Sequence, residues 1–338
     1  MGDFELSSAS APDYLRARGA VAFGTPVVGR ELGGGVSNMV VLVEAGADRF
    51  VLKQALPQLR VADEWFADQS RIFRERDGMA DAAKLLPAGW VPEVLFSDDA
   101  EHLFAMEALP AEAQDWKSRL MRGVVERTFA RRAGIALGLT VRGSRGSESF
   151  AYKYADSTAF DQLRTDPYYR TIGQRHPDLA QAAEDWIGEV AGRKQALVHG
   201  DWSPKNMMVV GERMVFIDYE CAHYGDPAFD AAFCINHFLL KAFHRPYQKD
   251  EYLGLARVFF TWILAVLPAP ALADFEQATA RHLSWLLLAR VDGKSPAEYI
   301  VDESLRDTIR GTAKRLIEER PAGIEAHLGA VEEAAGRS

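Results

Sequence analysis

Cysteine is scarce in this sequence: Cys221 and Cys234 are the two among 338 residues. Their spacing matches no metal-ligand pattern, and two such thiols are typical of a chain whose cysteines stay reduced and buried in the cytosol. A disulfide is the less favoured alternative. We therefore expect two buried, reduced thiols.

Long apolar runs are also missing. The most apolar late stretch, residues 253–267, includes Arg257 and is shorter than the ~20 residues that a membrane-spanning helix needs, so it predicts a core helix. The first residues, MGDFELSSASAPDY, have no basic segment followed by an apolar one, and no signal peptide is predicted. We expect a cytoplasmic protein with no membrane partner.

Basic charge is not in excess either. The formal net charge is -9 and the sequence pI is near 5.5, whereas binding to a nucleic-acid backbone depends on clustered Lys and Arg. We therefore expect no nucleic-acid partner. With 48% hydrophobic and 26% charged residues, the chain can bury one large core or two moderate ones behind a polar surface.

Strand and helix patterns divide the chain into two parts. Residues 20–107 combine β-branched strands, a hairpin turn at Gly46-Ala47-Asp48 and a charged, Ala-rich helical stretch at 63–86. Helical spacing takes over after that, residues 140–157 have the composition of a loop, and two short strands follow within 197–220. Four amphipathic or buried helices come last, at 229–243, 250–267, 272–291 and 302–319.

The predicted fold class is α+β. We expect a small β-rich N-terminal lobe over residues 1–107 and a larger, mostly helical C-terminal lobe over residues 108–338. A short connection near 106–110 would join them. No internal repeat or low-complexity segment is visible in the sequence.

A glycine-rich turn gives the first indication of chemistry. Gly33, Gly34 and Gly35 lie between two predicted strands, and Lys53 lies on the strand after the hairpin. The backbone N–H groups of such a turn and one ammonium group can bind the same anion. Glycine runs between strands are, however, mostly plain turns.

A second set of residues is more specific. Asp201, Asn206 and Asp218 lie in LVHGDWSPKNMMVVGERMVFIDYE, with a hairpin-length interval before the last of them. Phosphoryl transfer needs a carboxylate at the attacking hydroxyl and oxygen ligands for a Mg²⁺ ion that bridges the phosphates. Asp201 would accept the hydroxyl proton, Asn206 would bind the metal from the same loop, and Asp218 would add a second oxygen ligand.

These residues carry a family resemblance. HGDWSPKN, VFIDYE and GDPAFDAA resemble the catalytic loop, the metal-binding loop and the following helix of the aminoglycoside phosphotransferase and choline kinase superfamily, whose two-lobed fold is similar to that of protein kinases. Within that superfamily, ELGGGVSNMVVLV, LKQALPQLRV and RTDPYY are most similar to methylthioribose kinases. The resemblance covers roughly residues 10–245 and implies ATP and Mg²⁺ as cofactors.

The resemblance also implies a nucleotide site in the N-terminal lobe. The glycine turn and Lys53 would bind the phosphates, Glu75 would be the ion-pair partner of Lys53, and the backbone of FAMEALP would bind adenine. The nucleotide-binding residues implied in this way are Gly33, Gly35, Asn38, Lys53, Glu75, Met106, Glu107 and Ala108. Asp201 matches the catalytic base, with Asn206 and Asp218 as metal ligands.

Neighbouring residues are expected to have supporting roles. The resemblance implies that Asp230 accepts hydrogen bonds from the catalytic-loop backbone, and His199 is expected to be a satisfied loop histidine rather than a proton carrier. The role of Glu220 is left open between a contact to metal-bound water and a basic partner. Arg281 and Arg290, nine residues apart on one helix, face opposite sides; one could meet an acceptor, but surface pairing is favoured.

We predict an ATP-dependent small-molecule O-phosphotransferase that transfers the γ-phosphoryl group to a hydroxyl of a small alcohol or sugar. Methylthioribose or a related sugar is the first acceptor considered, and an aminoglycoside or other amino-alcohol is the alternative. A non-catalytic nucleotide-binding pseudokinase is a less favoured alternative. A protein kinase is disfavoured because no DFG follows the metal-binding Asp and no APE closes an activation segment. A homodimer is left open.

Overall fold

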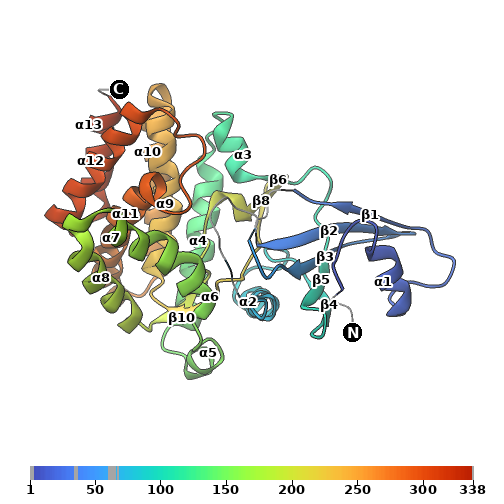
Figure 1. Ribbon diagram of the computed structural model, residues 1–338. Helices are drawn as coiled ribbons and strands as arrows, with labels where there is room; N and C mark the ends of the chain where they lie inside the picture. Colours follow the sequence, from blue (N-terminus) through green and yellow to red (C-terminus); the bar gives the residue numbers. More distant parts are fainter. Residues whose placement is uncertain (1–3, 34–36, 60–65, 67, 337–338) are drawn as a thin grey trace. The chain divides into compact units, whose positions relative to one another are not determined.

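The computed structural model describes residues 4–33, 37–59, 66 and 68–336 (Figure 1). The chain forms two compact units, each of which is described by itself. Unit 1 consists of Met1–Ala113 with Val215–Glu220, and unit 2 consists of Gln114–Met214 with Cys221–Ser338. The short segment that carries Asp218 therefore belongs to the same unit as the N-terminal sheet.

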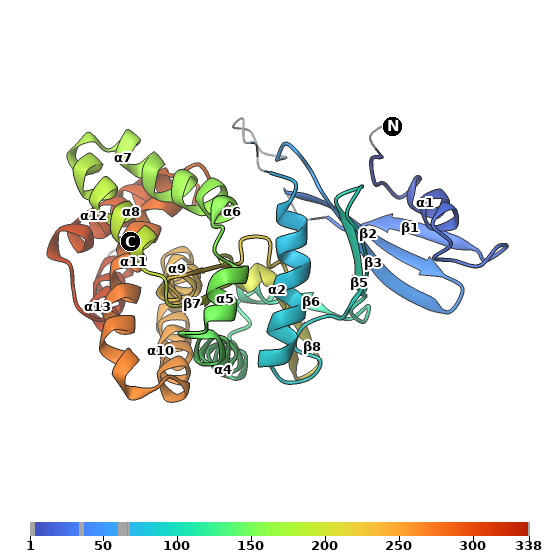
Figure 2. The ribbon, with the colours of Figure 1, turned by 90° about the horizontal axis from the view of Figure 1, so that it is seen from below.

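Unit 1 is built on a five-stranded antiparallel sheet. In spatial order its strands are β1 (Val27–Glu31), β2 (Asn38–Ala45), β3 (Asp48–Ala55), β5 (Leu103–Glu107) and β4 (Val94–Asp98). Two helices complete the unit, α1 (Ala11–Ala17) and α2 (Arg71–Leu85). Figure 2 shows α1 beside β1 and α2 alongside β5.

Alternating apolar residues bury one face of this sheet against the N-terminal segment. Leu6 and Leu15 from that segment pack on strand residues that include Val41, Val43, Leu52, Leu103 and Ala105. Strand β3 is paired on both sides, so Lys53 stands opposite Val40 of β2 and Phe104 of β5. Hydrogen bonds to both neighbouring strands thus fix the backbone at Lys53.

The hairpin between β2 and β3 has the predicted turn. Ala45 pairs with Asp48, and Gly46 between them has a φ of 64°, which glycine adopts without steric cost. The helix expected from residue 63 begins later, at Arg71. The Asp68 carboxylate accepts the N–H of Ser70 at 2.8 Å and holds a turn ahead of the helix. Residues 60–65 and 67 lie outside the described residues.

Unit 2 is mostly helical. Its α-helices are α3 (Trp116–Met121), α4 (Arg127–Ser144), α5 (Glu148–Lys153), α6 (Thr158–Phe160), α7 (Thr171–Arg175), α8 (Ala180–Gly192), α9 (Ala228–His244), α10 (Lys249–Val266), α11 (Leu272–Asp292), α12 (Glu303–Glu319) and α13 (Ile324–Ala335). A π-helix, Asp161–Arg170, lies between α6 and α7. The predicted late helices are confirmed as α9 to α12.

Short strands interrupt the helices, as predicted for residues 197–220. One small sheet has the order β6 (Gln114–Asp115), β8 (Met207–Val210) and β9 (Arg213–Phe216), and another pairs β7 (Ala196–Val198) with β10 (His223–Gly225). The loop predicted at 140–157 is wrong in part. Ser147 accepts the N–H of Phe150 at 3.5 Å and so begins the short helix α5.

Helix α9 is the centre of unit 2. Its residues 228–243 are all buried, and α10, α11 and α13 pack around it (Figure 1). A helix that is covered on every side is usually apolar all round, so the buried polar residues of α9 call for an explanation. Cys221 and Cys234 are both buried and free, as predicted. No helix in the described part of the chain is both long enough and apolar enough to cross a bilayer.

A buried histidine is expected to make the free energy of unfolding depend on pH. His327 of α13 is fully buried and contacts the Ser284 hydroxyl through Nε2 at 2.7 Å; burial lowers its pKa from 6.5 to about 4. The unfolded chain binds a proton below pH 6.5 whereas the folded chain does not, so this group removes about 3 kcal/mol of unfolding free energy between pH 7 and pH 4. In urea titrations, His327→Gln should therefore flatten the acid side of the stability profile. His102→Gln, at a partly exposed histidine, is the control; parallel profiles for both variants and the parent would contradict the assignment.

Candidate active site

The ammonium group of Lys53 lies between two carboxylates in unit 1. Lys53 Nζ donates to Glu75 Oε1 of α2 and to Asp218 Oδ1, each at 2.6 Å. All three side chains are largely buried. The structure thus brings together a lysine on β3, a glutamate on α2 and the aspartate that follows β9.

Negative charge is in excess around this lysine. Burial acts to lower the pKa of Lys53, but the carboxylates of Asp218, Glu75 and Glu220 outweigh it and raise the pKa, so the ammonium stays protonated. Burial is also the main cause that raises the pKa of Glu75, whose Oε2 is buried with no hydrogen-bond partner. Lys53 and Arg71, which pairs with Glu220, are two cations facing three carboxylates, so one negative charge is left for a further cation to balance.

Asp218 has an unusual backbone. Its φ is 74°, and within the described residues only His102 and Arg320 share a positive φ among non-glycine residues. Such a conformation costs on the order of 1–3 kcal/mol and is common at functional sites. In this conformation the Asp218 carboxylate accepts from Lys53 Nζ.

Glu220 has a basic partner. Its carboxylate accepts from Ser37 Oγ at 2.7 Å, from Asn38 Nδ2 at 2.9 Å and from Arg71 Nε at 3.3 Å. Arg71 of α2 also donates to the carbonyl of Leu56 at 2.7 Å. Glu220 therefore ties the start of β2, which follows the glycine-rich segment, to helix α2, and it has the basic partner that was one of its two expected roles.

The other nucleotide-binding residues predicted from the sequence are spread along unit 1. Gly33 follows β1 and faces open space, and Gly35 lies outside the described residues. Asn38 begins β2, and its Oδ1 is buried without a hydrogen-bond partner. Met106 and Glu107 end β5, and Ala108 follows. The N–H of Glu107 donates to the carbonyl of Glu93 at 2.8 Å, so it is occupied within the sheet.

In unit 2, Asp230 holds the loop that follows β7. From the first turn of α9, its carboxylate accepts the N–H of His199 at 2.7 Å and that of Gly200 at 2.8 Å, and burial raises its pKa to about 7 against these two donors. His199 Nδ1 accepts the N–H of Asp201 at 3.1 Å. Gly200 has a φ of 79°, and a Cβ there would lie 2.5 Å from the Cβ of Cys221, so only glycine fits.

Asp201, at the end of this loop, is held by a second buried cation. Arg164 Nη2 lies 2.9 Å from Asp201 Oδ2, Nε donates to the carbonyl of Gly200 at 2.6 Å, and Nη1 donates to the carbonyl of Leu163 at 2.6 Å. Lys205 Nζ lies 4.0 Å from the same carboxylate oxygen. Asp230 thus fixes the N–H groups of the loop, and Arg164 fixes its carbonyl and its carboxylate.

Asn206 lies on the same loop as Asp201. It ends the 3₁₀ turn Pro204–Asn206, and its Nδ2 donates to the carbonyl of Asp201 at 3.1 Å. This bond orients the side-chain amide, whose oxygen is the atom suited to a hard metal ion. Asn206 and Asp218 belong to different compact units, so their joint binding of a metal stays a prediction. No group of three or more His, Cys, Asp or Glu arranged for a metal occurs in the described ranges.

Comparison with known proteins assigns the family. Residues 28–262, which make up most of the chain, match the model of the phosphotransferase enzyme family. The chain belongs to this family. The resemblance predicted from the sequence is thereby confirmed.

Two relatives of this chain are both named methylthioribose kinase. The chain is 31% identical to a methylthioribose kinase of Escherichia coli O45:K1 over 244 residues, which are 64% of this chain and 58% of the relative. It is 28% identical to a methylthioribose kinase of Pectobacterium atrosepticum over 261 residues, 68% and 64% of the two chains. The chain therefore spans less than two thirds of the length of either relative.

A solved structure shares the fold. The Plasmodium vivax ethanolamine kinase matches with a TM-score of 0.52 and 11% identity over 93% of this chain and 90% of that chain. The small antiparallel sheet and the mostly helical remainder agree with this likeness. The predicted α+β, protein-kinase-like fold is confirmed.

Arg164 is the residue of this phosphotransferase family site that sequence reasoning missed. It lies in RTDPYY, which contributed to the resemblance but received no role. The segment forms a π-helix with Pro167 inside, a rare structure that is frequent at functional sites. The unusual Pro within a helical segment was the available signal, but nothing in it points to Asp201, 37 residues further on.

Replacement of Arg164 is expected to lower kcat strongly. Arg164→Met should lower kcat by about 100-fold, because a displaced carboxylate no longer meets the acceptor hydroxyl in line, while the KM for ATP changes little. Arg164→Lys should recover part of kcat and keep the acid limb of the kcat–pH profile in place, whereas Arg164→Met should shift that limb upward. The matched control is Arg170→Met, on the same π-helix but half-exposed. Equal kcat–pH profiles for Arg164→Met and Arg170→Met would contradict a positioning role.

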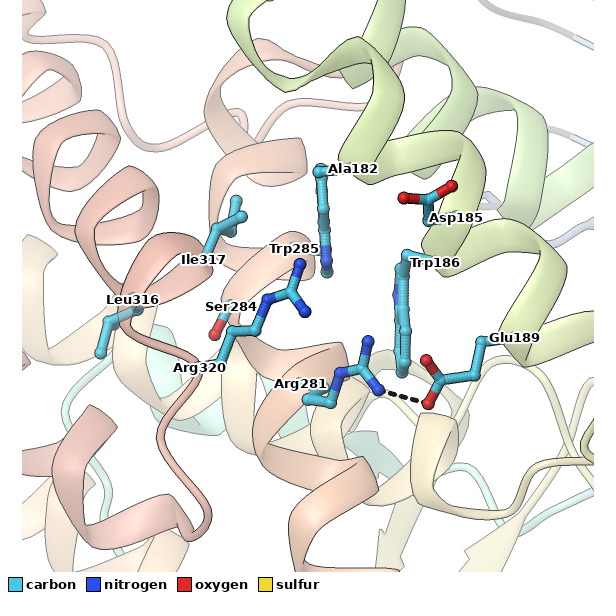
Figure 3. A pocket seen from close by; sticks show the side chains of 10 residues that line it. All are labelled: Ala182, Asp185, Trp186, Glu189, Arg281, Ser284, Trp285, Leu316, Ile317 and Arg320. Carbon is cyan, nitrogen blue, oxygen red and sulfur yellow. Dashed lines mark hydrogen bonds and ion pairs between the residues drawn. The ribbon is translucent and has the colours of Figure 1, made fainter.

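A pocket elsewhere in unit 2 holds none of the predicted site residues. It has a volume of about 130 Å³, and its lining residues are Ala182, Asp185, Trp186, Glu189, Arg281, Ser284, Trp285, Leu316, Ile317 and Arg320 (Figure 3). Arg281 lies over the Trp186 ring, 4.4 Å from its centroid, and pairs with Glu189. Arg281 thus has the surface pairing expected of it, whereas Arg290 is buried.

Proposed function

We propose that this protein is an ATP-dependent phosphotransferase that transfers the γ-phosphoryl group to a hydroxyl of a small polar acceptor. The observation that carries the proposal is the buried ammonium of Lys53 between the carboxylates of Glu75 and Asp218, in a chain of the phosphotransferase enzyme family. This arrangement supplies a fixed cation for phosphate oxygens and excess negative charge for a metal ion.

Unit 1 would bind the nucleotide. Lys53, oriented by Glu75, would contact the α- and β-phosphates, together with backbone N–H groups of the segment from Gly33 to Asn38. The backbone near Met106, Glu107 and Ala108 would bind adenine. In terms of the sequence, the region up to residue 107 is proposed as the nucleotide-binding lobe and 108–338 as the catalytic and acceptor-binding lobe.

The residues present suit a magnesium ion. Asp218 and Asn206 offer a carboxylate and an amide oxygen, both hard ligands, and the charge around Lys53 favours a further cation. These two residues would hold Mg²⁺, which when bound neutralises charge on the phosphates. The strained backbone at Asp218 supports a role beyond packing.

Asp201 would position the acceptor hydroxyl and accept its proton. A general base must hold its carboxylate in a fixed orientation. The contacts of Asp230 and Arg164 to the His199–Asp201 loop hold the Asp201 carboxylate in this way. Methylthioribose is the first acceptor to test because the two relatives are named for it, and other sugars come next. The proposed enzyme works in the cytoplasm, without nucleic acid or membrane, as a monomer or homodimer.

An acceptor screen tests this function. ADP release is measured with Mg-ATP and, separately, methylthioribose, pentoses, ribose 5-phosphate, choline, homoserine and an aminoglycoside. We expect at least one alcohol to raise ADP release far above the rate with ATP alone. ATP binding without acceptor-dependent ADP release, across the whole screen, would support the pseudokinase alternative instead.

A further inference from the structure

Helix α9 carries a row of side chains that starts beside the proposed base. Phe233, His237 and Lys241 follow one another at intervals of four residues, so they lie along one face of the helix. The guanidinium of Arg164, which contacts Asp201, lies 5.6 Å from the Phe233 ring centroid. The rings of Phe233 and His237 are 5.3 Å apart. The row therefore leads from the catalytic loop into the centre of unit 2.

Lys241, at the far end of this row, is a fully buried lysine. Its Nζ donates to the carbonyl of His237 at 3.2 Å and lies 5.3 Å from the ring centroid of Tyr299. The positive charges of two further residues, Lys117 from α3 and Arg290 from α11, disfavour the protonated form of Lys241. We call the set Lys117, His237, Lys241 and Arg290 the basic cluster.

The basic cluster has more positive than negative charge. Burial and then the charges of Lys117 and Arg290 lower the pKa of Lys241 to about 7, and the opposing effects of Glu298 and Cys234 do not balance them. Glu298 pairs with Lys117, but its side chain is 63% exposed, so solvent screens its charge. Burial and the charges of Lys241, Arg290, Lys117 and Lys205 lower the pKa of His237, which stays neutral.

Several buried polar atoms of this region have no hydrogen-bond partner. They are His237 Nδ1, Arg290 Nε and the hydroxyl of Tyr299. His237 is 6% exposed and Arg290 is 8% exposed, so solvent reaches them little. Arg290 uses Nη1 for Ser295 Oγ at 3.0 Å, which leaves Nε unused. Buried polar groups are nearly always paired, so such a cluster of unpaired ones indicates a polar ligand.

We propose that the basic cluster binds an anionic group of the phosphoryl acceptor, which is therefore an anionic sugar or polyol, bearing a phosphate or carboxylate. This inference rests on the proposed function and narrows its acceptor to anionic molecules, a class that excludes methylthioribose, which is neutral. His237 and Lys241 lie four and eight residues beyond Phe233, about 6 and 12 Å along the helix at 1.5 Å per residue. A chain of four to six carbons spans such a distance between its reactive hydroxyl and its anionic end.

The transfer itself is unchanged by this assignment. The acceptor O–H proton passes to Asp201, and the acceptor oxygen forms a bond to the γ-phosphorus. The bond between that phosphorus and the β–γ bridging oxygen breaks, and ADP leaves with the electron pair. The basic cluster acts on the other end of the acceptor, where it orients the molecule and sets the preference among acceptors.

Acceptors that share a carbon skeleton test the preference. The kcat/KM is compared for ribose, ribose 5-phosphate and ribonate, and for glucosamine against glucose 6-phosphate. We expect the anionic member of each set to exceed the neutral or cationic one by at least about tenfold, the ratio that one good charged contact gives. Comparison of ribose 5-phosphate with ribonate shows whether the enzyme prefers a phosphate or a carboxylate. A neutral or cationic acceptor that equals the anionic one would overturn the proposal.

Binding of an anion can be measured without turnover. With saturating ADP present to fill the nucleotide site, inorganic phosphate should raise the melting temperature of the parent protein and of Arg281→Met, which changes a partly exposed arginine of the same helix that lies outside the cluster. It should not raise that of Lys241→Met or Arg290→Met. Without phosphate, Lys241→Met should melt above the parent because an uncompensated buried cation is gone, whereas loss of a purely structural lysine would lower the melting temperature.

These measurements separate the two proposals. Phosphate stabilisation that depends on Lys241, in a protein that phosphorylates no acceptor, would leave the basic cluster standing and contradict the proposed function. Equal phosphate shifts in the parent and in Lys241→Met, in a protein that does phosphorylate an alcohol, would leave the proposed function standing and contradict the cluster.

Discussion

Replacement of Asp201 by asparagine should lower kcat by about 10²–10⁴-fold, the range that a positioned general base contributes. Asparagine keeps the shape and can still accept from Arg164, but it cannot take the hydroxyl proton. The loop should stay in place, because its N–H groups are bound by Asp230 and not by the side chain of Asp201. The KM for ATP and the melting temperature should therefore change little. The measurement is the ADP-release rate at saturating ATP and acceptor.

The control for this variant is Asp185→Asn, an exchange of the same type at an aspartate of α8 that belongs to the pocket of Figure 3. It should behave as the parent does. If Asp201→Asn keeps nearly full activity at saturating substrate, the assignment of the base is wrong, whatever the family.

Replacement of Lys53 by methionine should affect both activity and stability. Without the ammonium, the phosphates lose their fixed cation, and kcat/KM for ATP should fall by about 10²–10³-fold, as for the loss of one preorganised charged donor. Glu75 and Asp218 would then face each other without a cation, and breaking a buried pair in this way costs about 3–5 kcal/mol of unfolding free energy. Steady-state kinetics and urea unfolding measure the two effects.

A double variant separates these two effects. Lys53→Met with Glu75→Gln removes one of the opposed carboxylates, so part of the lost stability should return, while kcat/KM should stay low. Lys84→Met is the matched control, because its ammonium pairs with Asp81 at 2.7 Å on the same unit but is largely exposed. A Lys53→Met protein with unchanged kcat/KM for ATP would contradict the nucleotide role of Lys53.

The sequence pattern was sufficient for much of the fold. Strand alternation and the Gly46 turn predicted the hairpin, and helical spacing predicted the four late helices, because both signals are local and repeat over many residues. The exact start of α2 and the short helix α5 were not predicted. Both begin at a side chain, Asp68 or Ser147, that accepts a backbone N–H, and composition does not reveal such single hydrogen bonds.

The site was predictable only where residues stand in a motif. Asp201 and Asn206 share one loop, and their spacing along the sequence identified both as candidate site residues. Arg164 and the basic cluster were not predicted in these roles, and the basic partner of Glu220 was one of two alternatives left open, because the partners come from distant parts of the sequence and no spacing rule links Lys117 to Lys241 or Arg290. Such contacts are set by the packing of helices around α9, which a single sequence does not encode in any short pattern.

The most direct test of the central claim follows the phosphorus atoms themselves. The parent protein is incubated with Mg-ATP and each acceptor in turn, and phosphorus NMR records the products. We expect the γ-phosphorus signal to be replaced, for at least one acceptor, by that of a phosphate monoester together with ADP, and we expect Asp201→Asn to form that ester far more slowly. Formation of the ester by Asp201→Asn at the parental rate, or no ester with any acceptor while ATP binds, would contradict the account.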